Sequence, residues 1–275
     1  MYYRFPSIDN FKQQNFSFKI RQILVAELEK QYSKFEVSET TLNNIQLLKK
    51  SNTFTVTTGH QLNLFTGPLY FLYKIVSTIN LCKQLKSEYP ENNFVPMYWM
   101  ATEDHDFEEI NYFNFKNHKI KWNRESFGPV GRLSTNGLEK VYAILEKEFG
   151  SSKNADYLKN LFQKSYLGHA NLSDATRFLA NELFKKEGLV ILDGDSIELK
   201  KVFVPYIKEE LLNQTSHKKV LESNAVLKDY KIQVNPREIN LFYIEDNLRE
   251  RIVFENGKYK INDTNLEFTE KEILN

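Results

Sequence analysis

The spacing of apolar residues near the N-terminal third predicts a strand, a helix and a second strand in direct succession. The β-branched run over 54–58 predicts a buried strand that breaks at Gly59. Gly67 and Pro68 then open a helix, with the proline near the first turn, where a missing N–H costs nothing. The apolar run over 94–100 predicts the next strand. This order favours parallel strands joined by a right-handed crossover.

The pattern downstream predicts further α/β structure. Residues 112–122 alternate between apolar and polar and predict an antiparallel ribbon, and 189–192 predict another buried strand. Helices are also predicted over 20–35, 138–149, 155–166, 172–186, 197–212 and 218–227, and short strands over 241–243, 251–254 and 258–261. We therefore predict the α/β class, with a Rossmann-like, mostly parallel sheet and a small antiparallel β element.

Composition and charge narrow the class of protein. The 275 residues suffice for one large α/β domain, and the balance of 37 basic against 36 acidic residues argues against a nucleic-acid partner. We find no secretory signal and no apolar run long enough for a membrane span, so no membrane partner is expected. The single cysteine, Cys82, lies in an apolar helical pattern and is expected to be a buried thiol. These features favour a cytoplasmic protein.

The first candidate site is the segment TGHQLNLFTGPLY, residues 58–70, at the carboxyl end of the first predicted strand. Ligands bind at such strand ends in open α/β sheets. Gly59 would allow a ligand close to the backbone, and the helix after Gly67 could hold an anion at its N-terminus. His60 could donate to a phosphate or act as an acid or base. The alternative is that both glycines are turn residues and that His60 caps a loop.

The second candidate site follows the second strand. Carboxylates crowd around one histidine, and the candidate catalytic residues are Glu103, Asp104, His105 and Asp106. Such groups can bind an ammonium group or a metal, or act as a general base. Their spacing matches no defined metal motif, so we predict no metal site. A solvated acidic loop is the alternative, which the adjoining buried strand disfavours.

Two further positions are candidates for binding. Asp193 ends the strand over 189–192 and could accept from a ribose or sugar hydroxyl, although a turn that caps the next helix is an equal alternative. Arg237 offers a planar fork suited to a carboxylate or phosphate, with a surface ion pair as the alternative.

Five segments together resemble one known family. They are TGHQLNLFTGPLY, PMYWMATEDHDFEEIN, GPVGRL, GLVILDGD and NPREINLFYI, in order along nearly the whole chain. The chain resembles the bacillithiol biosynthesis cysteine-adding enzymes, the cysteine ligases. The resemblance carries over Gln61, Thr66, Gly67 and Tyr70 as binding residues, whereas many relatives have Gln in place of His60. Thr58 in the same segment is a further candidate binding residue. The resemblance implies a Rossmann-like core over 1–275 similar to class I nucleotidyltransferases, with inserts at about 111–170 and 215–262.

The resemblance also implies a reaction. Family members add L-cysteine to glucosaminyl-malate in the last step of bacillithiol biosynthesis. The activating cofactor is left open, with a nucleotide such as ATP or ADP as the candidate, and the chain has no P-loop motif. The carboxylates of the second site would hold the ammonium group of cysteine or deprotonate the attacking amine.

The family's members are longer and pair into homodimers through a C-terminal coiled coil. In this chain a capping-box pattern, Thr269 with Glu272, opens a helix that the sequence does not complete. We therefore expect the N-terminal portion of such an enzyme, inactive by itself. Two other classes remain open: another adenylate-forming or nucleotidyl-transfer ligase on the same fold, and a non-catalytic module that binds a nucleotide or a thiol.

Overall fold

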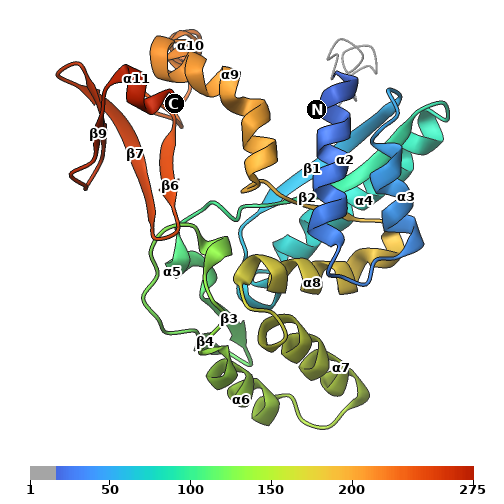
Figure 1. Ribbon diagram of the computed structural model, residues 1–275. Coiled ribbons are helices and arrows are strands. Elements are labelled where there is room, and N and C mark those ends of the chain that lie inside the picture. The colour runs from blue at the N-terminus through green and yellow to red at the C-terminus, as the bar shows by residue number, and fades with distance from the viewer. Residues whose placement is uncertain (1–16) are drawn as a thin grey trace. The chain divides into compact units, whose positions relative to one another are not determined.

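The computed structural model describes residues 17–275 and contains a three-stranded sheet, a two-stranded ribbon and a four-stranded sheet in that part of the chain (Figure 1). The helices are α2 (Phe18–Tyr32), α3 (Glu39–Leu47), α4 (Tyr70–Glu88), α5 (Phe107–Ile110), α6 (Leu138–Glu148), α7 (Lys153–Phe162), α8 (Leu172–Phe184), α9 (Ile197–Asn213), α10 (Thr215–Val226) and α11 (Glu270–Ile273). The strands are β1 (Thr53–His60), β2 (Asn93–Met100), β3 (Tyr112–Phe115), β4 (His118–Lys121), β5 (Val190–Asp193), β6 (Phe242–Glu245), β7 (Leu248–Glu255), β8 (Lys258–Ile261) and β9 (Glu267–Phe268).

The described chain divides into two compact units. The first contains residues 17–58, Leu72–Trp99 and Ala180–Leu192. The second contains Gly59–Phe71, Met100–Leu179 and Asp193–Asn275. Both predicted inserts, 111–170 and 215–262, therefore lie within the second unit.

The first unit is built on the three-stranded sheet, whose order β1-β2-β5 places β2 in the middle. The strands are parallel, which confirms the predicted Rossmann-like α/β class. Four consecutive residues of β2, from Val95 to Tyr98, are buried, as expected for a strand covered on both faces. The hydroxyl of Tyr32 on α2 accepts a hydrogen bond of 2.7 Å from the N–H of Ile191, which fixes this helix against β5.

The predicted break of the first strand at Gly59 is wrong. Strand β1 continues through Gly59 to His60, and Gly59 is not among the residues with a positive φ. The reason is backbone pairing: the N–H of Ala101 donates to the carbonyl of His60 at 3.0 Å and keeps the chain extended beyond the β-branched run. The reversal comes later, where Phe65, Thr66 and Gly67 have φ values of 48°, 68° and 50°.

The two-stranded ribbon of the second unit has the predicted antiparallel pairing of β3 with β4. The helix predicted over 155–166 is regular only to Phe162 and then widens into a π-helical turn over Gln163–Leu167. The ring of Phe162 lies 5.0 Å from that of Phe65, and the ring of Phe65 lies 5.8 Å from that of Phe113. These aromatic contacts join the loop after β1 to the ribbon and to α7.

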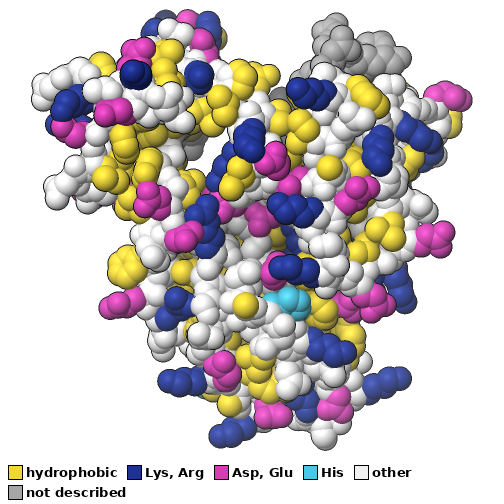
Figure 2. Space-filling view, in the orientation of Figure 1, with side chains coloured by type: hydrophobic (Ala, Val, Ile, Leu, Met, Phe, Trp, Pro, Cys, Tyr) yellow, Lys and Arg dark blue, Asp and Glu magenta, His cyan; other side chains and the backbone are white. Residues whose placement is uncertain are grey.

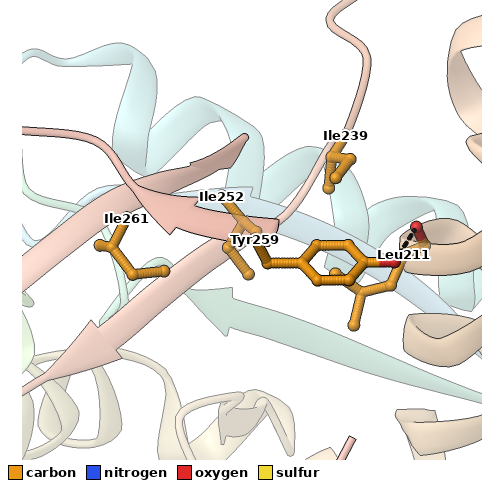
Figure 3. Packing of buried hydrophobic residues seen from close by; sticks show 5 residues of the cluster. All are labelled: Leu211, Ile239, Ile252, Tyr259 and Ile261. Carbon is orange, nitrogen blue, oxygen red and sulfur yellow. Dashed lines mark hydrogen bonds between the residues drawn. The ribbon is translucent and has the colours of Figure 1, made fainter. Parts of the chain in front are cut away.

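The four-stranded sheet, order β6-β7-β8-β9, has a small hydrophobic core of its own. Its buried members are Leu211, Ile239, Ile252, Tyr259 and Ile261 (Figure 3). The hydroxyl of Tyr259 donates to the carbonyl of Leu211 at 3.2 Å, which ties β8 to the end of α9. The predicted hairpin between β7 and β8 and the predicted capping box at the start of α11 are both confirmed.

Side chains of both charges lie on the described surface. Lys and Arg side chains are interspersed with Asp and Glu on the face shown in Figure 2. Among residues 17–275, no helix combines the length and apolar character that a bilayer crossing requires.

Cys82 is buried as predicted, and burial raises the pKa of its thiol to about 12.

Candidate functional site

A polar cluster forms in the second unit from the segments that follow β1, β2 and β5. In a parallel sheet the carboxyl ends of all strands meet at one edge, so these segments become neighbours. The hydroxyl of Thr102 donates to Oδ1 of Asp193 at 2.5 Å and joins the segment after β2 to the end of β5. The candidates Glu103, Asp104 and Asp193 are thereby brought together.

Asp193 is engaged by the chain itself. One carboxylate oxygen accepts from Thr102 and from the N–H of Asp195, at 2.5 and 2.9 Å, and the other accepts from the hydroxyl of Ser173 at 2.5 Å. The hydrogen bond from the N–H of Asp195 forms the turn that was the alternative to a binding role for Asp193. The residue that caps α9 is Ser196 rather than Asp193. Asp193 therefore joins the segment after β2, the turn after β5 and α8, and a substrate hydroxyl would have to compete with the hydroxyls of Thr102 and Ser173.

Asp195 forms the strongest ion pair of the cluster. Its side chain is 8 % exposed and accepts from Nε of Arg132 at 2.7 Å and from Nη2 at 3.0 Å. Lys200 also contacts it, and Nη1 of Arg132 reaches Asp246 at 2.8 Å. Burial alone would raise the pKa of Asp195, but the two cations outweigh it and hold this pKa below its usual value.

Arg132 is placed by the segment GPVGRL, which lies along the loop after β2. The N–H of Val130 donates to the carbonyl of Asp104 at 2.7 Å, and the N–H of Gly131 donates to that of Thr102 at 2.9 Å. A side chain at position 131 would place its Cβ only 2.6 Å from Cβ of Thr102. Glycine is required here because the two backbones approach so closely.

The acidic segment itself has a defined geometry. Nε2 of Gln61 donates to Asp104 at 3.0 Å, and the N–H of His105 does so at 2.8 Å. Burial opposes them, yet these bonds and the charge of Arg249 lower the pKa of Asp104. Ligand atoms of Asp104, His105 and Asp106 lie within 4.8 Å of one another. The three could hold a metal ion, but a cationic side chain already contacts His105.

That cation is Arg249, which sequence analysis did not select. Its Nη1 lies 2.7 Å from Nδ1 of His105, and its guanidinium carbon lies 3.8 Å from the centre of the Phe242 ring. Arginine can only donate, so Nδ1 of His105 accepts and the imidazole proton is on Nε2. Arg249 thus extends the cluster from the strand ends to the hairpin of β6 and β7.

Glu103 stands out among the carboxylates. Its Oε2 is buried and accepts no hydrogen bond from residues 17–275. Burial raises the pKa of Glu103, and the charges of Asp193 and Asp195 add to this shift, whereas its own N–H and Arg249 oppose it. A buried carboxylate oxygen without a hydrogen-bond donor is suited to bind the cationic group of a ligand.

The segment after β1 contributes mainly through Gln61. His60 is 6 % exposed, its ring lies 4.8 Å from that of Tyr70 and 5.1 Å from that of Phe71, and its Nδ1 lies 2.9 Å from the carbonyl of Gln61. A carbonyl only accepts, so this nitrogen donates. His60 is therefore packed between aromatic rings, whereas Gln61 reaches both Asp104 and Glu109.

The other residues of that segment shape the loop. Thr58 is half-buried within β1, and Thr66 and Gly67 lie in the left-handed turn before α4. A Cβ at Gly67 would lie 2.3 Å from Cβ of Asn63, so only glycine fits. Backbone strain of this kind is often found at functional sites.

Arg237 is not brought to the cluster. It is exposed in the loop between α10 and β6 and forms neither an ion pair nor a hydrogen bond within residues 17–275. The cluster instead uses residues that sequence analysis did not single out, namely Thr102, Arg132, Ser173, Lys200 and Arg249. Arg132 could have been selected from the sequence, because it lies within the segment GPVGRL that resembles the family. Arg249 lies among other charged residues of β7, and no local pattern distinguishes it.

A hollow adjoins the cluster on the same unit. It has a volume of about 500 Å³ and is lined by Arg132, Ile244, Glu245, Asp246, Asn247 and Leu248. Space for a small molecule therefore lies beside the Arg132 end of the cluster.

Comparisons with known proteins identify the family. The model of the family "Bacillithiol biosynthesis BshC, N-terminal Rossmann-like domain" matches residues 1–275. The chain is 67 % identical over 281 residues to a Flavobacterium psychrophilum protein named "Putative cysteine ligase BshC", a match that covers 100 % of this chain and 53 % of the relative. Relatives of the same name from Flavobacterium johnsoniae and Shouchella clausii are 61 % and 31 % identical, over 100 % and 94 % of this chain and 53 % and 50 % of the relatives. The chain thus spans about half the length of these curated relatives, and it belongs to the BshC family of bacillithiol biosynthesis, whose N-terminal Rossmann-like domain it contains.

Proposed function

We propose that the whole protein is a ligase that joins the carboxyl group of L-cysteine to the amine of glucosaminyl-malate, the last step of bacillithiol biosynthesis. Its relatives carry the name of a cysteine ligase, and the polar cluster at the strand ends offers the charged groups that such a reaction needs. The observation that carries the proposal is this concentration of carboxylates and arginines in the one place where an open α/β sheet binds ligands.

Each proposed role follows from the environment of a side chain. Glu103 has a buried Oε2 that accepts no hydrogen bond within residues 17–275, so an ammonium group of the substrates is the partner that we propose for it. Asp104 stays ionised because its pKa is lowered, so it stabilises positive charge rather than transferring a proton. A free carboxylate is a poor electrophile, so activation is needed, for which ATP or ADP is our proposed cofactor.

The decisive experiment is the profile of small thiols in the source cell after disruption of the gene. Loss of bacillithiol together with accumulation of glucosaminyl-malate is the expected result. Persistence of bacillithiol, in a cell with no second copy of the gene, would reject the proposal. The leading candidate would then be another adenylate-forming ligase, which exchange of pyrophosphate into ATP with a panel of acids would reveal.

A second experiment concerns the site. In the protein at the length of its relatives, Asp104→Asn should lower turnover by about 100-fold, since one charge-stabilising group commonly contributes two to three orders of magnitude. Asp246→Asn is the matched control, because the side chain of Asp246 is 86 % exposed and pairs with Arg132 alone among residues 17–275. Equal turnover of the two variants would exclude Asp104 from the reaction.

A further inference from the structure

We propose that Arg249 and Glu103 together bind an α-amino acid, with the arginine on its carboxylate and the glutamate on its ammonium group. The binding site itself is inferred from the geometry. Its identification with the cysteine site rests on the proposed function.

Most carboxylates of the cluster already accept hydrogen bonds from the chain itself. Asp104 accepts from Gln61 and from a backbone N–H, and Asp193 accepts from two hydroxyls and a backbone N–H. Asp195 is paired with two cations. The buried groups of the cluster that hydrogen-bond to nothing in residues 17–275 are Nε of Arg249 and Oε2 of Glu103. One positively charged hydrogen-bond donor and one negatively charged acceptor thus remain available to a ligand.

Arg249 has the features of a carboxylate-binding residue. Its guanidinium plane is supported by the Phe242 ring, and its orientation is fixed by Nδ1 of His105 at 2.7 Å. No carboxylate within residues 17–275 forms an ion pair with it, although its charge acts on both Glu103 and Asp104. An arginine whose fork is held in place but not paired can form the bidentate contact that it prefers with a carboxylate.

Glu103 supplies the other half of the site. The negative charges of Asp193 and Asp195 both act on it, and the positive charge of Arg249 opposes them only in part, because the pKa of Glu103 remains raised. An ammonium group at Oε2 would relieve this repulsion and provide the missing hydrogen-bond donor. Nη1 of Arg249 lies 2.7 Å from Nδ1 of His105, which is two residues along the chain from Glu103, so one small ligand can reach both ends of the site.

The charges also decide against other ligands. A dicarboxylate or a phosphate would be attracted by Arg249 but repelled by the negative charges of Glu103 and Asp104. A diamine would be attracted by the carboxylates but repelled by the guanidinium group of Arg249. Only a molecule that carries one charge of each sign, a short distance apart, complements both groups. An α-amino acid is the smallest such molecule.

The test is calorimetric titration of the purified chain with L-cysteine, with cysteamine, which lacks the carboxylate, and with 3-mercaptopropionate, which lacks the amine. Each missing charge-assisted contact should weaken binding by at least about 10-fold. Arg249→Gln should weaken the binding of cysteine by a similar factor and leave that of cysteamine unchanged. Arg251→Gln is the matched control, since Arg251 lies two residues further along β7, is exposed and should leave affinity intact.

Three results would overturn the proposal: no binding of cysteine at millimolar concentration, equal binding of either analogue, or full affinity in the Arg249→Gln chain. The analogues test the site in the unaltered chain, so a variant that failed to fold would not leave the question open. The thiol profile is an independent measurement. Charge-dependent cysteine binding in a protein whose disruption leaves bacillithiol intact would retain the binding site and reject the ligase function.

Discussion

The ion pair between Asp195 and Arg132 offers the sharpest test of how the cluster is held together. Arg132 contacts two carboxylates at nearly equal distances, 2.7 Å to Asp195 and 2.8 Å to Asp246. Their exposure differs greatly, because the side chain of Asp195 is 8 % exposed and that of Asp246 is 86 % exposed. The two acids therefore form an internal comparison of a buried and an exposed partner of the same cation.

Asp195→Asn should lower the free energy of unfolding by about 2 kcal/mol, because it weakens buried hydrogen bonds to charged groups while Arg132 and Lys200 remain partly in contact with water. Asp246→Asn should cost about 0.5 kcal/mol, as for exposed pairs. Urea unfolding at pH 7, followed by circular dichroism, measures both values. If both variants lost the same stability, burial would not govern this interaction and the reasoning would fail.

The same pair predicts a dependence on pH. The pKa of Asp195 is lowered in the folded chain, so its contribution is fully present above its unfolded pKa of about 3.9. The contribution is lost as the pH falls through the folded value. The difference in stability between the natural chain and Asp195→Asn should therefore be constant near neutrality and shrink below about pH 4. A difference that stayed constant on acidification would show that charge is not its source.

Three further changes have defined outcomes. Gly67→Ala should destabilise the chain by more than about 2 kcal/mol, because the new Cβ would lie 2.3 Å from Cβ of Asn63. Gly150→Ala should cost about 1 kcal/mol, because Gly150 also has a positive φ but has open space around it, so urea unfolding of both variants separates the steric clash from the backbone strain. Cys82 has a thiol pKa of about 12, so a disulfide reagent at pH 8 should modify it at least about 100-fold more slowly in the folded chain than in urea, and equal rates would contradict its burial. Tyr259→Phe removes the buried hydrogen bond to α9 and should cost about 1 kcal/mol in thermal unfolding, with a cost near zero refuting a role for that bond.

Much of the fold could be predicted because its signals are local. Apolar periodicity placed most of the helices and strands but missed α3, α5 and β9, and single residues placed several of the ends. The turn at Asn256 and Gly257 and the capping box at Thr269 depend on backbone preferences of a few adjacent residues, and both are confirmed. The conformation of Gly59 was predicted wrongly because it is not set by its neighbours in sequence. Its conformation follows from pairing with β2, a partner distant in sequence.

The candidate site shows the same limit. The sequence identified the acidic segment, because carboxylates after a buried strand are unusual in themselves. It did not identify Arg249, which is one of several charged residues in a short strand, or Lys200, which is one of many lysines on a helix. These residues matter only because folding brings them to Glu103 and Asp195.

The sequence by itself determined the order of most elements, the parallel sheet and the strand ends at which chemistry was to be sought, since periodicity and β-branching act over a few residues. Tertiary structure alone decided which charges meet. It paired Asp195 with Arg132, engaged Asp193 with hydroxyls of the chain and left Arg237 exposed, whereas Arg249 came to lie against His105. The physical reason is that charge interactions depend on distance and burial, and both are set by contacts between residues far apart in the chain.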